Sequence, residues 1–492
     1  MCGIVVLQGP NANQRLPACL QRIRHRGPDD YQHYQHQDIA FGFVRLAING
    51  QENDGKQPLL WNNMVGLFNG EIYNHRVLAQ QYQLAINGQC DSQVLLPLFA
   101  KKNLAIIDEL DGFFSAVIYN KATKKLYSFR DHIGKKPLFI GRSESELFIT
   151  SELKALESIT WFRALPLGAA QINLVTTGIE IFRPHKSPIL VDAQKENRTP
   201  QNIYHHLRTN FTEAVIKRLP SINTPVAVFL SGGLDSSLVA AIATQYRQNC
   251  VYFTLGHKKS PDREKVEQLI KELNLRHWHY IDLPTPEQLP QLIATVVYAT
   301  ESYNPSIISN GLATYLLAQA VRKQGIKIAL SGEGADELFG GYYSYLSPEK
   351  WQLIRGQLIY DMSFTELRRL DLCSMAHGIE VRCPFLDARV KVLADNLPFS
   401  QYFANNTNKI SLREAFASSL PEYILHRPKT SFDVGSGLRS MVVRFLRRNG
   451  RTEREELLSI WKQFFTYDHQ HPYFSHYPVF DHGIDQRREV HR

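Results

Sequence analysis

The 492-residue chain lacks the features of membrane, secreted and zinc-binding proteins. It has no run of about 18 apolar residues, which a membrane-spanning helix requires. It also does not begin with a basic segment followed by an apolar stretch, as a secretory signal does. Its six cysteines show no CxxC spacing, which argues against a disulfide framework and a zinc site. These absences predict a cytoplasmic protein with reduced thiols.

The charge of the chain gives no indication of a nucleic-acid surface. The net charge of +9 is spread along the sequence, and no basic stripe alternates with aromatic residues. We therefore expect small-molecule partners, no nucleic acid and no membrane, and we leave a homodimer open. At this length one hydrophobic core is not enough, so two or three domains are expected.

Short apolar runs broken by Gly, Pro, Asn and Asp fill residues 1–185. This pattern predicts strands packed face to face, with helices near 14–23 and 92–101. The strands are expected at 4–7, 39–43, 64–68, 113–119, 125–130, 138–140 and 147–150. Residues 186–202 are rich in Lys, Pro, Asn and Gln and are interpreted as a linker.

Strands and helices alternate from residue 203, which predicts a parallel, doubly wound α/β sheet. Helical periodicity follows from about residue 348, so this second domain is placed at 203–446. The tail, 447–492, is weakly patterned. It contains four irregularly spaced histidines, and we expect it to dock on a surface or stay mobile rather than bind a metal: His469, His471, His476 and His482.

The chain begins Met1-Cys2-Gly3. If Met1 is removed, Cys2 carries both a thiol and a free amine, which titrate near pH 8.5 and pH 8 in model compounds. One residue then supplies a nucleophile and its own base. A cysteine also occurs at position 2 by chance, so the rest of the chain has to decide.

The predicted strand 226–230 runs directly into Ser231-Gly232-Gly233-Leu234-Asp235-Ser236-Ser237 and an apolar helix. Backbone amides and hydroxyls at a helix N-terminus bind phosphate. A Walker loop is absent, because no Gly-Lys-Ser/Thr follows. Asp235 is a candidate carboxylate for a magnesium ion that bridges phosphates. The alternative is an ordinary glycine-rich turn between strand and helix.

A second acidic loop, Ser331-Gly332-Glu333-Gly334-Ala335-Asp336-Glu337, follows the apolar run that ends at Leu330. In an open α/β sheet both loops face the crevice at the carboxyl ends of the strands. A magnesium nucleotide would offset the cost of burying Glu333, Asp336 and Glu337 together. The alternative for Asp336 and Glu337 is a stabilising role in the first turn of a helix.

The chain up to about residue 438 resembles the glutamine-hydrolysing asparagine synthetase family. The motifs that carry the resemblance, in chain order, are Cys2-Gly3-Ile4, Arg24-His25-Arg26-Gly27-Pro28-Asp29, Asn69-Gly70-Glu71-Ile72-Tyr73-Asn74-His75, Arg130-Asp131-His132-Ile133-Gly134 with Lys136-Pro137-Leu138, 231–237, 331–341 and Pro384-Phe385-Leu386-Asp387. The resemblance implies an N-terminal class II glutamine amidotransferase domain of the α/β/β/α Ntn-hydrolase type. It also implies a C-terminal PP-loop ATP pyrophosphatase domain and AMP-forming amide synthesis that uses ATP and Mg²⁺.

For the first domain, the resemblance makes Cys2 the nucleophile on the glutamine amide, with Asn69 and Gly70 as the oxyanion hole. A preorganised donor of this kind contributes about 2.7 to 4 kcal/mol. The residues implied to hold glutamine are Arg45, Leu46, Ala47, Ile48, Asn49, Asn69, Gly70, Glu71 and Asp91. Two alternatives stay open: Asp91 caps the helix that begins at Ser92, or Arg45 is a surface residue.

For the second domain, the resemblance makes Asp235 and Asp336 the magnesium carboxylates and Glu333 the proton acceptor for incoming ammonia. Lys429 is implied to stabilise the departing pyrophosphate, a task that suits an ammonium group; the alternative is a solvated loop lysine. The residues implied to bind ATP are Leu230, Ser231, Gly232, Gly233, Asp235, Ser236, Leu255, Ser331 and Gly332.

The implied reaction has two sites. Cys2 forms a γ-glutamyl thioester and releases ammonia, while a carboxylate attacks ATP to give an acyl-adenylate that ammonia then converts to an amide. Free ammonia would be protonated in water, so a water-poor passage between the domains is expected.

The acceptor is less clear than the reaction, with aspartate the leading candidate. Ser309 stands where the family has an arginine that faces the acceptor. Either another cation replaces that arginine, or the acceptor is a different carboxylic acid. A β-lactam-synthetase-like cyclase and a non-catalytic sensor are further alternatives. Cys2 with Asn69-Gly70 counts against the cyclase, and the intact Cys2, Asp235 and Lys429 count against the sensor.

Overall fold

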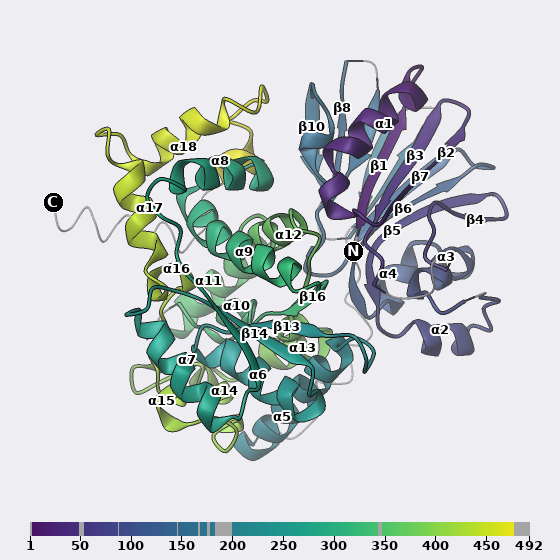
Figure 1. The fold of residues 1–492 in the computed structure, drawn as a ribbon. Helices are drawn as coiled ribbons and strands as arrows, with labels where there is room; N and C mark the ends of the chain where they lie inside the picture. The colour runs from purple at the N-terminus through teal and green to yellow at the C-terminus, as the bar shows by residue number, and fades with distance from the viewer. Residues whose placement is uncertain are drawn as a thin grey trace. The chain divides into compact units, whose positions relative to one another are not determined.

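The computed structural model describes residues 2–48, 54–86, 88–144, 146–165, 168–174, 178–182, 199–342 and 347–476. Two compact units divide them (Figure 1). The first unit holds the residues up to 182 and the segment 465–473; the second holds residues 199–464 and 474–476. Most of the predicted linker lies outside the described residues, so its limits and those of the two domains stay predictions.

Two antiparallel six-stranded sheets build the first unit. The first has the order β10-β8-β9-β1-β3-β2, with β1 (Cys2–Gln8), β2 (Asp30–His36), β3 (Ile39–Arg45), β8 (Phe139–Arg142), β9 (Leu147–Thr150) and β10 (Trp161–Ala164). The second has the order β12-β11-β7-β6-β5-β4, with β4 (Leu59–Trp61), β5 (Met64–Ile72), β6 (Gly112–Asn120), β7 (Lys125–Arg130), β11 (Ala169–Asn173) and β12 (Gly178–Phe182).

Helices cover the outer faces of both sheets, which gives four layers. Between the sheets, Ile4 of the first packs in one apolar core with Val65 of the second. On the outside of the first sheet, Gly42 leaves room for α1, because a Cβ there would lie 2.8 Å from side-chain atoms of Leu16 and Leu20. The helices of this unit are α1 (Ala12–Arg22), α2 (His75–Gln81), α3 (Leu95–Lys102) and α4 (Ile106–Glu109). The predicted α/β/β/α sandwich is confirmed.

A five-stranded, all-parallel sheet forms the centre of the second unit, which confirms the predicted doubly wound architecture. Its order is β15-β14-β13-β16-β17, with β13 (Val226–Phe229), β14 (Cys250–Leu255), β15 (His277–Ile281), β16 (Ile328–Leu330) and β17 (Glu380–Arg382). The chain proceeds from β13 toward one edge and then returns to β16 on the other side of β13. Such a reversal opens a crevice at the carboxyl ends of the two central strands.

Helices make up most of the rest of this unit (Figure 1). They are α5 (Pro200–Arg218), α6 (Leu234–Tyr246), α7 (Pro261–Glu272), α8 (Leu289–Thr300), α9 (Pro305–Lys323), α10 (Ala335–Phe339), α11 (Pro348–Asp361), α12 (Glu366–Met375), α13 (Ala388–Asp395), α14 (Ile410–Ala415), α15 (Glu422–Leu425), α16 (Phe432–Gly435), α17 (Leu438–Leu446) and α18 (Glu453–Trp461). A short hairpin joins β18 (Phe403–Ala404) to β19 (Thr407–Asn408), and α19 (Pro472–Ser475) ends the described chain.

The tail segment 465–473 docks in the first unit through aromatic residues. The Tyr467 hydroxyl lies 3.0 Å from the carbonyl oxygen of Leu153 and 2.9 Å from that of Leu156. The His471 ring stacks on Phe162 with the centroids 4.0 Å apart. Of the two outcomes expected for the tail, docking therefore applies to this segment, whereas His482 lies outside the described residues.

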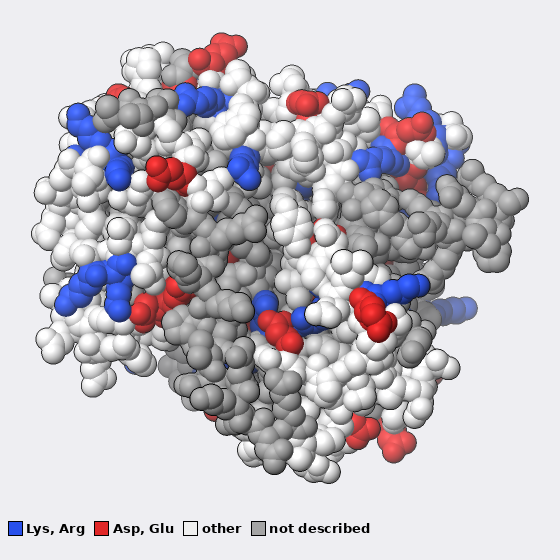
Figure 2. Space-filling view, turned by 180° about the vertical axis from the view of Figure 1, so that it is seen from behind, with Lys and Arg blue, Asp and Glu red and all other residues white. Residues whose placement is uncertain are grey.

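Three further observations concern the whole described chain. No helix within it is long and apolar enough to cross a membrane. The six cysteines are free thiols. On the face drawn in Figure 2, basic and acidic side chains are interspersed rather than gathered by sign. The described residues visible on that face therefore form no broad basic patch of the kind that binds nucleic acid.

Candidate active sites

Cys2 begins β1, where its backbone nitrogen donates a hydrogen bond to Asn69 Oδ1 at 2.9 Å. Asn69 is fully buried, and its Nδ2 has no hydrogen-bond partner among the described residues. A buried donor left unpaired is costly, so its presence beside a nucleophile suits an oxyanion that forms during reaction. The close approach of β5 to β6 at this point requires a glycine at position 70, because a Cβ there would lie 2.0 Å from the carbonyl oxygen of Phe113.

The charged residues expected to hold glutamine are all buried in the same unit. Arg45 pairs with Cys2 across β1 and β3 and is only 5% exposed, so the surface alternative is wrong. Asp91 is the first residue of the short 3-10 helix Asp91–Val94, and its Oδ2 accepts from the backbone nitrogen of Ile72 at 2.6 Å, beside Glu71. Leu46, Ala47 and Ile48 follow β3 directly, and Asn49 lies outside the described residues.

A buried ion-pair network beneath Cys2 was not predicted from the sequence. Arg26 Nε donates to the carbonyl oxygen of Cys2 at 3.0 Å, and its Nη1 lies 2.6 Å from Glu152 Oε1. Lys154 and His25 contact the other oxygen of Glu152 at 2.7 and 3.0 Å. Burial raises the pKa of Glu152, but these three bases outweigh it and hold the pKa well below its usual value. The network fixes the backbone of Cys2.

Glu152→Gln is expected to destabilise the first unit by about 3 to 5 kcal/mol near neutral pH, because it leaves buried positive charges uncompensated. The folded-state pKa of Glu152 is depressed, so its contribution is complete above the unfolded pKa near 4.5 and is lost as pH falls below it. Below pH 4.5 the difference between wild type and variant should shrink by about 1.4 kcal/mol per pH unit. Denaturant unfolding at several pH values measures it, and a constant difference would contradict this account.

Hydroxyl groups close the loop 231–237 of the second unit, which the sequence predicts to bind phosphate and which we call the phosphate loop. Ser231 Oγ and Ser236 Oγ lie 3.0 Å apart, and the backbone nitrogen of Ser231 donates to Ser236 Oγ at 3.1 Å. Gly332 brings the second loop against this one, because a Cβ there would lie 2.9 Å from Asp235 Cβ. The two loops therefore meet at the reversal between β13 and β16, as the sequence predicts.

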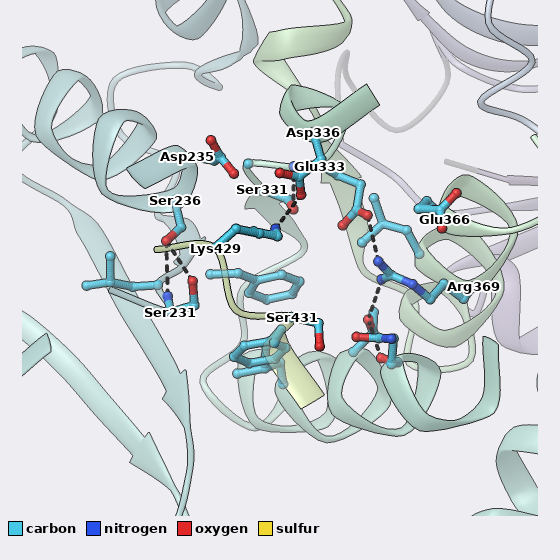
Figure 3. A pocket seen from close by; sticks show the side chains of 18 of the residues that line it. Ser231, Asp235, Ser236, Ser331, Glu333, Asp336, Glu366, Arg369, Lys429 and Ser431 are labelled. Carbon is cyan, nitrogen blue, oxygen red and sulfur yellow. Dashed lines mark hydrogen bonds and ion pairs between the residues drawn. The ribbon is translucent and has the colours of Figure 1, made fainter. Parts of the chain in front are cut away.

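A pocket opens between these loops (Figure 3). Nine of the predicted residues line it: Leu230, Ser231, Asp235, Ser236, Ser331, Gly332, Glu333, Asp336 and Lys429. Gly233 lines a neighbouring cavity, which shares Ser231 and Lys429 with the first. Gly232 and the fully buried Leu255 line neither of the two cavities.

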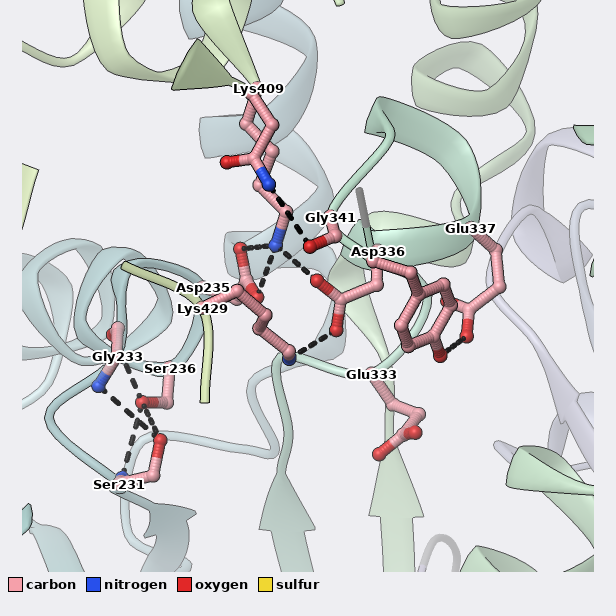
Figure 4. A network of polar contacts seen from close by, with 12 residues as sticks. Ser231, Gly233, Asp235, Ser236, Glu333, Asp336, Glu337, Gly341, Lys409 and Lys429 are labelled. Carbon is pink, nitrogen blue, oxygen red and sulfur yellow. Dashed lines mark hydrogen bonds and ion pairs between the residues drawn. The ribbon is translucent and has the colours of Figure 1, made fainter. Parts of the chain in front are cut away.

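Asp235 and Asp336 face each other across one cation, the ammonium group of Lys409, and Lys429 pairs with the second oxygen of Asp336 (Figure 4). Burial raises the pKa of Asp336, but both lysines outweigh it and hold the carboxylate ionised. Two carboxylates beside a phosphate loop are a donor set that fits Mg²⁺, which completes its shell with phosphate oxygens and water. No group of three or more His, Cys, Asp or Glu in the described chain is placed to hold a metal without such help.

Helix α12 brings a guanidinium group into the same pocket. Arg369 Nη2 lies 2.6 Å from Glu333 Oε1, and Glu366, one turn earlier, also lines the cavity (Figure 3). Burial and the nearby carboxylate of Glu337 raise the pKa of Glu366 well above its usual value. The pocket thus combines a phosphate loop with an arginine and a carboxyl group. Neither Arg369, Glu366 nor Lys409 was predicted from the sequence, because no local motif marks them.

Two family models match the chain. One describes a glutamine amidotransferase domain and matches residues 1–172, and the other describes asparagine synthase and matches 206–359 and 357–466. The chain belongs to the asparagine synthase family.

Curated members of the asparagine synthase family are similar to the chain over most of its length. A probable glutamine-hydrolysing asparagine synthetase of Acanthamoeba polyphaga mimivirus is 33% identical, covering 88% of this chain and 85% of its own. A probable glutamine-hydrolysing asparagine synthetase of Dictyostelium discoideum is 31% identical, covering 89% of this chain and 85% of its own. Asparagine synthetase B of Escherichia coli K12 is 32% identical, covering 84% of this chain and 78% of its own.

Ser309, at the position where the resemblance implies an arginine, has a structural role in this chain. It is fully buried in α9, and its hydroxyl donates to Asp433 Oδ2 at 2.6 Å. It does not line the cavity that contains Arg369. Ser309 is therefore not placed to contact an acceptor in this cavity.

Ser309→Ala is expected to cost about 1 to 3 kcal/mol of stability, because it removes a hydrogen bond from the buried carboxylate of Asp433. The KM for the acceptor should stay unchanged. Thermal melting and steady-state kinetics with varied acceptor test both parts. A large rise in that KM without loss of stability would show that Ser309 faces the substrate.

Proposed function

We propose that the chain is a glutamine-dependent asparagine synthetase, which uses ATP to convert aspartate to asparagine with release of AMP and pyrophosphate. One observation carries the proposal: a single pocket contains the phosphate loop around Ser231 and, across it, the Arg369–Glu333 pair (Figure 3). A nucleotide and a small carboxylic acid can therefore lie together. Family membership and the buried Cys2–Asn69 contact in the other unit support the glutamine-dependent half.

At the first site, removal of Met1 turns the backbone nitrogen of Cys2 into an α-amino group that can accept the thiol proton. The thiolate attacks the side-chain amide carbon of glutamine, and Asn69 Nδ2 donates to the oxyanion that forms. The C–N bond of the glutamine amide then breaks. The leaving nitrogen takes the proton from the α-amino group of Cys2 and departs as ammonia, and water hydrolyses the thioester to glutamate. Arg45, Glu71 and Asp91 hold the charged end of glutamine.

At the second site, an oxygen of the acceptor carboxylate attacks the α-phosphorus of ATP, and pyrophosphate leaves. Ammonia then attacks the carbonyl carbon of the acyl-adenylate, AMP departs, and Glu333 accepts the excess proton. Mg²⁺, held by Asp235 and Asp336, would supply Lewis-acid stabilisation of phosphate charge. Lys429, whose ammonium already faces Asp336, would stabilise the leaving pyrophosphate.

Arg369 is proposed to be the cation that the sequence left unidentified. Its guanidinium pairs with Glu333 and lies 3.5 Å from Thr314 Oγ1, and a planar fork of donors matches a carboxylate. Glu366, on the same face of α12, would pair with the ammonium group of an amino-acid acceptor. This combination suits aspartate better than an acceptor without an amino group.

A cyclase of the β-lactam-synthetase type is not favoured, since the Cys2–Asn69 arrangement is intact. Cytoplasmic location and a homodimer stay predictions.

The proposal is tested by measuring AMP and pyrophosphate release from ATP and Mg²⁺ with glutamine and a panel of carboxylic acids. We expect release with aspartate and little with succinate, which lacks the ammonium group. Release driven by another acid alone would retain the amidotransferase but replace its substrate. No release with any acid would contradict the proposal.

A further inference from the structure

Lys409 occupies the position between the two carboxylates that we assign to the metal. Its Nζ lies 2.7 and 2.6 Å from the two oxygens of Asp235 and 2.5 Å from Asp336 Oδ1 (Figure 4). The lysine side chain is only 3% exposed. Lys429, by contrast, contacts Asp336 alone of this pair and is about one-third exposed. Lys409 is therefore the cation that joins the two acids.

The backbone around Lys409 is built to place it there. The hairpin from β18 to β19 turns at Asn405 and Asn406, which both have positive φ, as a tight two-residue turn requires. Lys409 itself has a φ of 54° and precedes α14. On the opposite side, a Cβ at Gly341 would lie 1.8 Å from Asp336 Oδ1 and 2.5 Å from Lys409 Cε. The position of the Lys409 ammonium group thus depends on the tight turn, on the positive φ of Lys409 and on the lack of a side chain at Gly341.

The charges of this cluster balance without a metal. Asp235 and Asp336 carry two negative charges, and Lys409 and Lys429 carry two positive charges. A free Mg²⁺ that approached this site would meet two fixed ammonium groups and would lack the phosphate oxygens that normally complete its shell. Mg²⁺ that arrives with a nucleotide brings negative phosphates, which give both lysines new partners.

We propose that Lys409 is a resident counter-ion that keeps the Asp235–Asp336 pair together before ATP binds and makes metal binding depend on the nucleotide. The inference rests on the proposed function, which assigns the metal to these two carboxylates. When the nucleotide enters, the ammonium group of Lys409 moves from the carboxylates to phosphate oxygens, and the carboxylates become metal ligands. The enzyme therefore takes up Mg²⁺ and ATP together.

The test measures Mn²⁺ binding to the full chain by equilibrium dialysis, in which Mn²⁺ held by the analogue alone distributes equally between the two chambers. It is run with and without an ATP analogue whose α,β-bridge is a methylene group. Wild type should bind Mn²⁺ only with the analogue. Lys409→Met should bind Mn²⁺ without the analogue at least about ten-fold more tightly than wild type does, because a repelling charge is gone. Its melting temperature without metal should be lower, and Mn²⁺ alone should restore it.

Two matched variants show whether the effect belongs to Lys409. Lys429→Met leaves Lys409 between the acids, so its nucleotide-free binding should increase much less than that of Lys409→Met. Lys391→Met removes a partly exposed lysine paired with Asp395 and should behave as wild type. An equal gain in Lys429→Met would overturn the inference, as would equal nucleotide-free binding by wild type and Lys409→Met. Lys409→Gln provides the same test if Lys409→Met does not fold. If no protein binds Mn²⁺ even with the analogue, the metal assignment of the proposed function fails as well.

Discussion

Cys2→Ala is expected to lower glutamine-dependent amide formation by at least about 10⁴-fold, in the range seen when a covalent nucleophile is removed from a hydrolase. Synthesis from added ammonium should continue at the wild-type rate, because the pocket of the second unit contains no part of the first site. Glutamate release and AMP release, measured on the same samples with glutamine or ammonium chloride as nitrogen source, report the two activities separately.

Cys19→Ala is the matched control for this prediction. Cys19 lies buried in α1, and burial raises the pKa of its thiol to about 11, so it is a packing residue rather than a nucleophile. The control should keep both activities. If Cys2→Ala retains glutamine-dependent synthesis, the nucleophile is a different residue. If it loses ammonium-dependent synthesis while remaining folded, the assignment of separate tasks to the two units is wrong.

Arg369→Met is expected to lower kcat/KM for the acceptor roughly 100-fold, with most of the effect in KM. The reason is that loss of one partner from a partly desolvated charge pair costs about 2 to 5 kcal/mol. Stability should fall less than activity, because the guanidinium is held mainly by its pair with Glu333 at the pocket wall. The value of kcat/KM is obtained from steady-state rates of AMP release, with varied acceptor at saturating ATP and ammonium. Ammonium as the nitrogen source removes any influence of the first site.

Arg389→Met provides the comparison, since Arg389 forms a partly exposed ion pair with Glu213 far from any predicted site residue in sequence. A surface pair of this kind contributes about 0 to 1 kcal/mol, so the control should match wild type. If Arg369→Met raises the KM for ATP rather than for the acceptor, the guanidinium belongs to the nucleotide end of the pocket. If neither KM changes, the acceptor is held by other residues.

The sequence predicted the architecture well where periodicity is strong. The apolar runs of β1, β3, β5 and β6 and the alternation around β13 and β14 have clear patterns. It missed β2, whose residues Asp30–His36 are mostly polar and lie at a sheet edge. It also missed β17, which has only three residues. Short or polar strands form because a neighbouring strand offers hydrogen bonds, and one sequence does not show that neighbour.

The same limit applies to the sites. Asp336 could be chosen because a glycine-rich loop marks its position, and Asn69 because it lies in a motif that resembles the family. Glu152 lies far along the chain from Arg26, Lys409 from Asp336, and Arg369 from Glu333, with no distinctive neighbours. Arg369 lies on α12 and Ser309 on α9, and only the folded arrangement shows which of the two lines the pocket.

The most direct test of the central claim follows the nitrogen atom. The full chain is given glutamine labelled with ¹⁵N in its side-chain amide, together with ATP, Mg²⁺, aspartate and an excess of unlabelled ammonium at a pH near neutrality. We predict asparagine whose amide carries mostly ¹⁵N, formed in equal amounts with AMP, because ammonia released at Cys2 reaches the acyl-adenylate before it mixes with the solvent. Labelled ammonium in solution without labelled asparagine, or amide formation without AMP, would contradict the account.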